Sequence, residues 1–281
     1  MFAAFLSEDM TYSSAIWSLE SNTATETLEE AQIRKLNRHI DGAKIKASDH
    51  VLEIGTGWGS FAIQAVRRTG CRITTLTLSA EQKTLAEERI AAAGYRDRIT
   101  VKLMDYRALF VEVPFDKIVS IEMLEHVGPE YLDTYFRCIH RLLKSDGIAT
   151  FQCITMPEAR YKAYSRSEDF IRKYIFPNGH LPSISQLISS INNGSEGTLI
   201  VERVEDISGH YSKTLRLWKE KFAQNYDSII RPALITQHKK MDEREVAVFK
   251  RKWEVSNTKI LRVLFASSSE AHDLSVLFQL L

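Results

Sequence analysis

The sequence predicts an α/β fold with a doubly wound, mostly parallel sheet and helical cap insertions. Apolar runs typical of buried strands alternate with segments of helical periodicity between residues 25 and 155. The first apolar run ends in a glycine turn, VLEIGTGWGS at residues 51–60, as expected where a strand leads into a ligand-binding helix. After Pro157 the alternation stops. We therefore expect a single domain over residues 1–281, with insertions at about 157–190 and 209–253 that cap the ligand edge of the sheet.

Composition and charge exclude several classes of protein. Lys and Arg number 37 against 36 Asp and Glu, so the net charge of +1 provides no overall field for nucleic acid. No apolar run reaches the roughly 18 residues of a membrane span, and the start MFAAFLSEDM lacks the pattern of a signal peptide, so a cytoplasmic protein is expected. The cysteines Cys71, Cys138 and Cys153 show no CxxC or CxxH spacing, and no metal site is expected.

The expected elements follow from periodicity and from start and stop signals. Thr27 and Glu30 are placed as a capping box, and Ser79 stands at the start of another helix. An irregular loop is expected over FPNGHLPS, which contains two prolines and a glycine. Strands are predicted at residues 51–55, 72–78, 99–103, 115–121, 147–155 and 199–207, and helices at 25–42, 60–68, 79–93, 131–143, 159–174, 211–226 and 246–253.

The glycine turn suggests the kind of ligand. Gly55, Gly57 and Gly59 give the spacing GxGxG, whereas a dinucleotide site has GxGxxG and an acid about twenty residues later. Here the acid, Glu53, precedes the first glycine, where a carboxylate can accept a hydrogen bond from an α-amino group but would repel a phosphate. A zwitterion such as S-adenosylmethionine (SAM) fits this arrangement. The alternative is an ordinary glycine turn without a ligand.

The ends of the next two predicted strands carry further candidates for the cofactor. Thr77, Ser79 and Gln82 offer hydroxyl and amide groups to a ribose, although an acid would be a stronger match. Asp105 can accept from an adenine amino group, and the ring of Tyr106 can stack on the base. The alternative for Tyr106 is a half-buried aromatic at the edge of the sheet.

Glu122, Glu125 and His126 form the sharpest catalytic signal. They follow the predicted strand 115–121, at the edge where open α/β sheets bind ligands. The competing interpretation is a solvated helix start, where acids interact favourably with the helix dipole.

Seven motifs in order carry a family resemblance. They are MTYSSAIW, VLEIGTGWG, LTLSAEQ, DYR, EMLEHVG, DFIRKYIFPNGHLPS and HYSKTLRLW. Over residues 1 to about 254 the chain resembles the cyclopropane-fatty-acid synthase family, most closely the methyltransferase portion of its plant members. The resemblance implies a Rossmann-like class I SAM methyltransferase that adds a methylene or methyl group to the double bond of an unsaturated phospholipid acyl chain at a membrane surface.

The resemblance also implies roles for individual residues. Glu125 and Tyr211 fall on positions similar to the pair that holds bicarbonate, which in the family removes a proton as the ring closes. Together with His126, Gln152 and Ser14 they form the expected catalytic set. The positions that would hold SAM are Tyr12, Ser13, Gly55, Gly57, Thr77, Leu78, Gln82 and Tyr106, to which the residues themselves add Glu53, Gly59 and Asp105.

The sequence departs from the family pattern at three places. Ser14 stands where the family usually has cysteine, and Gln152 stands where bacterial members have histidine. After Glu254 the chain lacks the aromatic run with a cysteine that the family uses for the pocket wall, although residues 274–280 can still form the last, antiparallel strand. We therefore hypothesise that SAM binding survives and that acyl-chain methylation is weakened or lost.

Two other functions stay open at this point. An amine N-methyltransferase would use Glu122, Glu125 and His126 to position and deprotonate a nitrogen. A catalytically silent SAM- or lipid-binding protein would account for the altered tail. Residues 160–173, rich in basic and aromatic side chains, are a candidate for peripheral membrane docking, with a solvated helix face as the alternative. A homodimer is compatible with each of these functions.

Overall fold

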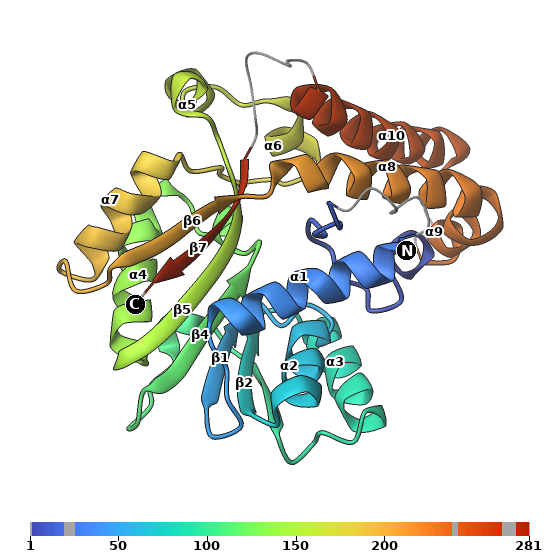
Figure 1. Ribbon diagram of the computed structural model, residues 1–281. Coiled ribbons are helices and arrows are strands. Elements are labelled where there is room, and N and C mark those ends of the chain that lie inside the picture. The colour runs from blue at the N-terminus through green and yellow to red at the C-terminus, as the bar shows by residue number, and fades with distance from the viewer. Residues whose placement is uncertain (1, 20–25, 238–240, 266–273, 281) are drawn as a thin grey trace.

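A computed structural model describes residues 2–19, 26–237, 241–265 and 274–280, with only the backbone described between 255 and 279 (Figure 1). The described residues form a seven-stranded sheet in the order β3-β2-β1-β4-β5-β7-β6. Strands β1 to β5 are parallel, and β7 runs antiparallel between β5 and β6. The doubly wound sheet and the final antiparallel strand are thus confirmed. The strands are β1 (His50–Ile54), β2 (Arg72–Thr77), β3 (Ile99–Leu103), β4 (Phe115–Ile121), β5 (Leu143–Thr155), β6 (Val201–Asp206) and β7 (Leu274–Leu280).

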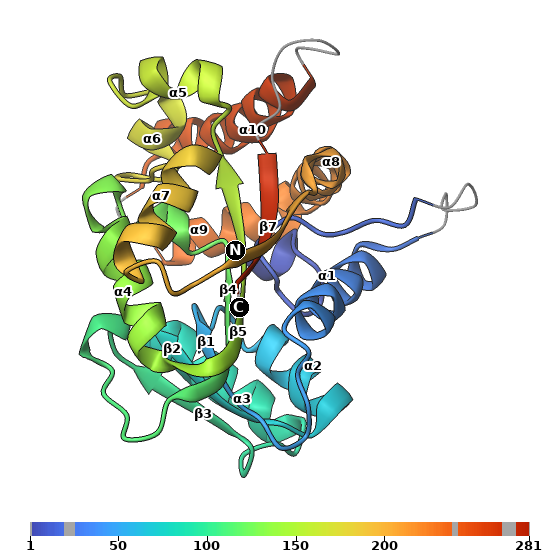
Figure 2. The same cartoon turned by 60° about the vertical axis from the view of Figure 1, so that its left-hand side comes forward.

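Helices cover both faces of this sheet. Helices α1 (Leu28–Gly42), α2 (Ser60–Thr69) and α3 (Ala80–Ala92) lie on one face, and α4 (Leu132–Leu142) and α7 (Ile184–Gly194) lie on the other (Figures 1 and 2). Two apolar clusters, one on each face, fill the space between strands and helices. Since both faces are covered, the central strands are almost continuously apolar, which is why they were recognisable in the sequence.

Helix α1 carries polar residues on its buried side. Its predicted capping box is confirmed: the Thr27 side chain accepts from Glu30 N at 3.2 Å, and Glu30 Oε2 accepts from Thr27 N at 2.8 Å. The helix buries a stripe at helical spacing that includes Gln32, Lys35 and His39, each 0% exposed. Such groups are found in an interior only when they are hydrogen-bonded or charge-paired, so this face points to a polar site.

The cap comes from the later part of the chain. Residues 159–174 were expected to be one helix but form α5 (Glu158–Tyr164) and α6 (Phe170–Tyr174), because the Asp169 side chain accepts from Arg172 N and starts a new helix. The predicted irregular loop that follows is confirmed. The other cap elements are α8 (Ser208–Asn225), the π-helix η6 (Tyr226–Ile230), α9 (Arg231–Gln237) and α10 (Glu243–Phe265).

The N-terminal segment fastens this cap to the sheet. Phe5 and Trp17 pack with residues of α8 to α10 in a third apolar cluster. Helix α7, by contrast, falls at the end of the first expected insertion but packs on α4 in the layer that flanks the sheet. Four short 3-10 turns complete the description: η1 (Phe2–Ala4), η3 (Tyr106–Ala108), η4 (Leu124–His126) and η5 (Pro129–Tyr131). None of the helices in the described part of the chain is long and apolar enough to cross a membrane.

Candidate functional site

The glycine turn between β1 and α2 forms the floor of a cavity. Gly55, Gly57 and Gly59 have φ of 102°, 50° and 86°, a region that side chains with a Cβ rarely adopt. A Cβ on Gly57 would meet no atom within 4 Å, so this face of the backbone is open to a ligand. A Cβ on Gly59 would lie 3.3 Å from the Cβ of Ala86. Gly59 therefore allows α2 to pack on α3, and it does not line the cavity.

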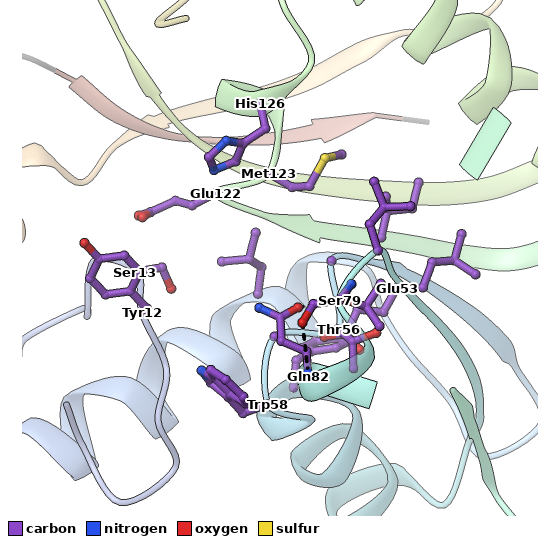
Figure 3. Close-up of a pocket in the computed structure, with 18 of the residues that line it drawn as sticks. Tyr12, Ser13, Glu53, Thr56, Trp58, Ser79, Gln82, Glu122, Met123 and His126 are labelled. Carbon is purple, nitrogen blue, oxygen red and sulfur yellow. Dashed lines mark hydrogen bonds between the residues drawn. The ribbon is translucent and has the colours of Figure 1, made fainter. Parts of the chain in front are cut away.

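Most of the residues expected to bind the cofactor line this one cavity of about 750 Å³ (Figure 3). They come from the N-terminal segment, from the ends of β1, β2 and β3, and from the loop after β4. The structure thus brings together the following predicted residues: Tyr12, Ser13, Glu53, Gly55, Gly57, Thr77, Leu78, Gln82, Asp105, Tyr106 and His126. Trp58 and Met123, which were not predicted, also line it.

Glu53 supplies an unpaired acidic group to the cavity. It is 4% exposed, its Oε2 has no hydrogen-bond partner, and burial raises its pKa to about 8. A buried polar atom without a partner is rare, and here it lies on the wall of an open cavity. A ligand with a cationic amino group would satisfy it. This observation and the open backbone of Gly57 together fit the methionine part of SAM.

The far end of the cavity suits a nucleoside. Thr77 Oγ1 donates to Gln82 Oε1 at 2.7 Å, which fixes both side chains at the end of β2. Asp105 is held by Arg107, whose hydrogen bonds lower the pKa of that carboxyl. The ring of Tyr106 is half-buried and meets Tyr135 edge-on at 5.1 Å, and burial raises its pKa to about 12. Tyr106 is thus both a packed edge aromatic and a wall of the cavity.

A second cavity of about 590 Å³ lies under the cap and is largely apolar. Glu125 and Tyr211 line it, but they do not line the first cavity. Tyr12, Glu122 and His126 line both, so the two spaces meet at these three side chains (Figure 3). Apolar side chains from β5, α5, α6 and the irregular loop surround the rest: Ile154, Met156, Ala159, Ala163, Phe170, Ile171, Phe176 and Leu181.

Glu122 is the most tightly held group at this junction. Its Oε1 accepts from Ser14 N at 2.8 Å and from Gln152 Nε2 at 2.7 Å. Its own N–H donates to Gln152 O at 2.7 Å, which continues the pairing of β4 with β5. Glu122 also has a φ of 47°, a strained conformation for a residue with a Cβ that typically costs about 1–3 kcal/mol. Backbone strain of this kind persists only where the surrounding structure enforces it, and it is found most often at functional sites.

Behind Glu122 lies a buried chain of neutral groups. His39 contacts Gln152 Oε1 through Nε2 at 3.3 Å and Thr150 Oγ1 through Nδ1 at 3.2 Å. Burial lowers the pKa of His39 to about 3, so the ring is neutral. Gln152 Nε2 is engaged as a donor, so its Oε1 accepts from His39 Nε2–H, and His39 Nδ1 accepts from the hydroxyl of Thr150. The carboxylate is thus held by a fixed line of donors that reaches into α1.

Lys35 provides a positive charge beside the carboxylates. Its ammonium group is fully buried and donates to the hydroxyl of Ser13. Burial lowers the pKa of Lys35 to about 8, and the nearby charges of Glu122 and Asp9 oppose this shift. Neither Lys35 nor His39 was predicted as a site residue. The available signal was their place on the apolar stripe of α1, where a charged or ionisable side chain is unusual.

Glu125 is buried with one oxygen satisfied. Its Oε1 accepts from Ile154 N at 2.6 Å, while Oε2 has no partner. Burial and the charge of Glu122 both raise its pKa. The pair can therefore hold one negative charge and one proton. Glu122, with two N–H donors and Lys35 nearby, is the better place for the charge. Burial also lowers the pKa of His126, and its ring meets Phe176 at 6.2 Å.

Ser14 and Gln152 do not lie where the family resemblance would need them for bicarbonate. Both are 0% exposed and line neither cavity, and their donors are engaged by Glu122 Oε1, Ala15 O and Ser14 O. A bicarbonate between Glu122 and Glu125 would also face a carboxylate at close range. The residues of the first cavity thus fit SAM, while Ser14 and Gln152 serve Glu122 and do not face a bound anion. Within the described residues, no group of three His, Cys, Asp or Glu could hold a metal ion.

Comparison with known proteins identifies the family. A family model described as mycolic acid cyclopropane synthetase matches residues 1–250. The chain belongs to this family. The tuberculostearic acid methyltransferase of Mycobacterium tuberculosis (strain ATCC 25618 / H37Rv) is 42% identical over 258 residues, which cover 91% of this chain and 57% of that protein. The cyclopropane-fatty-acyl-phospholipid synthase of Escherichia coli (strain K12) is 36% identical over 229 residues, or 82% of this chain and 55% of that protein.

A solved member of the family supports the fold and the cofactor. The crystal structure of a mycolic acid cyclopropane synthase complexed with SAH and CTAB superposes with a TM-score of 0.78 at 27% identity and covers 99% of this chain and 92% of that one. The Rossmann-like class I fold, the assignment to an enzyme family of SAM-dependent methyltransferases and the family resemblance in the sequence are thereby confirmed. The chain spans just over half the length of the two curated relatives above, at 57% and 55%.

Proposed function

We propose that the protein transfers a methyl group from SAM to the double bond of an unsaturated phospholipid acyl chain, and that loss of one proton then yields a cyclopropane ring or a methylene branch. The observation that carries the proposal is the opening of an apolar cavity under the cap onto the glycine-turn cavity at Tyr12, Glu122 and His126. An acyl chain in the first space would meet a methyl donor in the second. The names of the relatives, which include fatty-acid and phospholipid substrates, support the same class of acceptor.

The polar cavity would orient the donor. SAM supplies an electrophilic methyl group on a sulfonium. Glu53 would take its amino group, the open backbone at Gly57 would accommodate the amino-acid part, and the Thr77–Gln82 pair would face the ribose. Tyr106 and Asp105 would contact the adenine. Because an alkene is a weak nucleophile, alignment of this kind must supply much of the rate acceleration.

The apolar cavity would hold the acceptor and keep water away. Its side chains come from β5, α5, α6 and the irregular loop, and the loop is tied to the site because His180 N donates to Glu125 O at 2.8 Å. Tyr12 places an aromatic ring at the junction, where a cation would develop on the acyl chain, and Tyr211 places another on the wall of the second cavity. The face of an aromatic ring stabilises a cation, most strongly where water is excluded.

Methyl transfer can be followed directly. The protein is incubated with isotopically labelled SAM and vesicles of an unsaturated phospholipid, and the lipid fraction is analysed by mass spectrometry. We expect a mass increase of one CH2 unit on the acyl chain, and none with the saturated lipid of equal length. Absence of label from the lipid fraction, with SAM bound in calorimetry, would reject lipid methylation and favour a silent binding protein.

Amine N-methylation is a second candidate because of the charge at the junction. Glu122 and Glu125 could hold a cationic amine, and His126, with its pKa lowered by burial, could accept its proton. Label transferred to a small amine with none in lipid would favour this function.

Surface association belongs to the same proposal. Helices α5 and α6, with Arg160 and Arg172 lining the second cavity, would dock on an anionic bilayer, and a homodimer would present two such surfaces. Co-sedimentation with anionic and neutral vesicles, and light scattering for the dimer, test these two points separately.

A further inference from the structure

We propose that the carboxylate of Glu122 accepts the proton that is released from the transferred methyl group, so that this chain needs no bicarbonate. The inference rests on the proposed function, since it concerns the step that follows methyl transfer. It assigns a catalytic role to a residue that the family resemblance did not include.

Glu122 stands where a proton acceptor for this step must stand. It lines both cavities, at the point where the methyl donor would meet the acyl chain. Figure 3 shows its side chain extending from the loop after β4 toward Tyr12. A base must come within hydrogen-bonding reach of the carbon that loses its proton, and a residue that lines both cavities is placed to do so.

Two residues of the expected catalytic set, Ser14 and Gln152, hold Glu122. Ser14 N and Gln152 Nε2 each donate to Glu122 Oε1, at 2.8 Å and 2.7 Å. Both N–H groups thus donate to Oε1 of Glu122, and neither of them donates to Oε2. An anion from solution would have to displace a group that is covalently attached and already satisfied.

Gln152 acts here as a positioning residue. Its amide is oriented by His39, which is in turn held by Thr150, and all three side chains are 0% exposed. This fixed chain and the pairing of Glu122 N with Gln152 O hold Glu122 at its positive φ of 47°. A strained residue that is fastened at both its backbone and its side chain is typical of a preorganised catalytic group.

The charges around Glu122 favour an ionised base. Lys35 on α1 faces it, Glu125 on η4 is the neighbouring acid, and the phenols of Tyr12 and Tyr211 lie within electrostatic range. Burial raises the pKa of Glu122, while Lys35 and the two N–H donors keep the charged form accessible. A carboxylate of raised pKa is a stronger base than one in water, and it returns the proton to solvent more slowly.

The proton transfer balances without any other reactant. A C–H bond of the transferred methyl group breaks, and its electron pair closes the third bond of a cyclopropane ring. After a hydride shift along the chain, the same pair would instead form a methylene double bond. In both cases the proton goes to Glu122 and then to water. The assignment therefore holds for either product.

The test compares two substitutions at one position. Glu122→Gln keeps the shape and removes the base, so kcat should fall by roughly 10²–10⁴-fold, while the Kd for SAM in calorimetry stays unchanged. Glu122→Gly suits the positive φ and opens a space beside the freed donors Ser14 N and Gln152 Nε2. Added formate or bicarbonate should therefore restore part of the lost turnover in Glu122→Gly but not in Glu122→Gln.

The wild-type protein provides the decisive control. Its turnover in buffer stripped of carbon dioxide should equal that in buffer with added bicarbonate. A wild type that slows on removal of bicarbonate, or a Glu122→Gln variant with full turnover, would overturn the inference and leave the proposed function intact. A wild type that methylates no acyl chain in either buffer would instead reject the proposed function. For the positioning role, Gln152→Leu should move the acidic limb of the kcat profile to higher pH, because Glu122 loses a donor.

Discussion

The two cavities of this protein are built in different ways. The glycine-turn cavity is lined by backbone at positive φ and by single side chains at the ends of β1, β2 and β3. The cavity under the cap is lined by bulky side chains from β5 and from short helices that the sheet does not require. The first depends on main-chain geometry, and the second depends on side-chain volume.

This difference separates the two halves of the proposed reaction. A donor of fixed chemistry can be held by a turn that any sequence with the right glycines will form. An acceptor of variable length and shape needs a wall that can change without disturbing the sheet, and insertions provide it. Substitutions in one cavity should therefore leave binding in the other unchanged.

Gly57→Val should give the largest effect on the polar cavity. A β-branched residue at a φ of 50° is strained by about 1–3 kcal/mol, and its methyl groups would enter the space that the ligand needs. We expect SAM affinity in calorimetry to fall by more than about 100-fold, or about 2.7 kcal/mol. Gly94→Val is the matched control, because Gly94 has a φ of 78°, an open Cβ position and no place in the cavity. An equal loss of SAM affinity in both variants would mean that the substitutions act by destabilising the fold.

Ala163→Trp should impair use of the lipid substrate and leave SAM binding unchanged. Ala163 lines the second cavity from α5, and an indole there would fill part of its 590 Å³. Methylation of lipid should fall by about 10–100-fold, as expected when binding loses 1.4–2.8 kcal/mol, while the Kd for SAM stays the same. Lys162→Trp, on the same helix but outside the cavity lining, should leave both unchanged. A parallel loss of SAM affinity in Ala163→Trp would mean that the two cavities are not independent.

The fold could be predicted largely from local patterns. The strands β1 to β5, the capping box of α1 and the N-cap Ser79 of α3 each leave a signal within a few residues. The two short helices α5 and α6 were merged in the prediction, since no proline or glycine stands between residues 158 and 174 and only the Asp169 cap separates the helices.

The candidate site was predicted less completely, because its central contacts are long-range. The bond from Ser14 N to Glu122 joins residues 108 positions apart, and the bond from Gln152 Nε2 to Ser14 O joins residues 138 apart. The approach of Glu122 to Gln152 depends on the register of β4 against β5, where Ile121 pairs with Gln152, and register is not written in either strand alone. The family resemblance named Ser14 and Gln152, but their hydrogen bonds to Glu122 became visible only in the folded chain.

Glu53→Gln should weaken the donor site more modestly than Gly57→Val. The amide still accepts a hydrogen bond but carries no charge, so we expect about a tenfold loss of SAM affinity, or 1.4 kcal/mol. Because the pKa of Glu53 is raised to about 8 by burial, the free protein holds a proton there at neutral pH. An ammonium ligand would expel it. Binding of SAM at pH 7 should thus release close to one proton from the wild type, whereas residue 53 of the variant has no proton to release. Calorimetry in buffers of different ionisation enthalpy measures this difference.

The same carboxyl also has a pH-dependent effect on stability. The folded-state pKa of Glu53, about 8, exceeds the roughly 4.3 of an unfolded chain, so the folded state binds more protons between these values. Its contribution is complete below pH about 4 and is lost as pH rises toward 8, with a slope of at most about 1.4 kcal/mol per pH unit. Glu125 shifts in the same direction in both proteins, so only the difference between wild type and Glu53→Gln reports on residue 53. Urea unfolding at several pH values should show the wild type losing stability faster than the variant over this interval. If the free energy of unfolding changed with pH in the same way in both proteins, Glu53 would be ionised in the free protein. Its carboxylate would then attract a cation more strongly than the protonated carboxyl can.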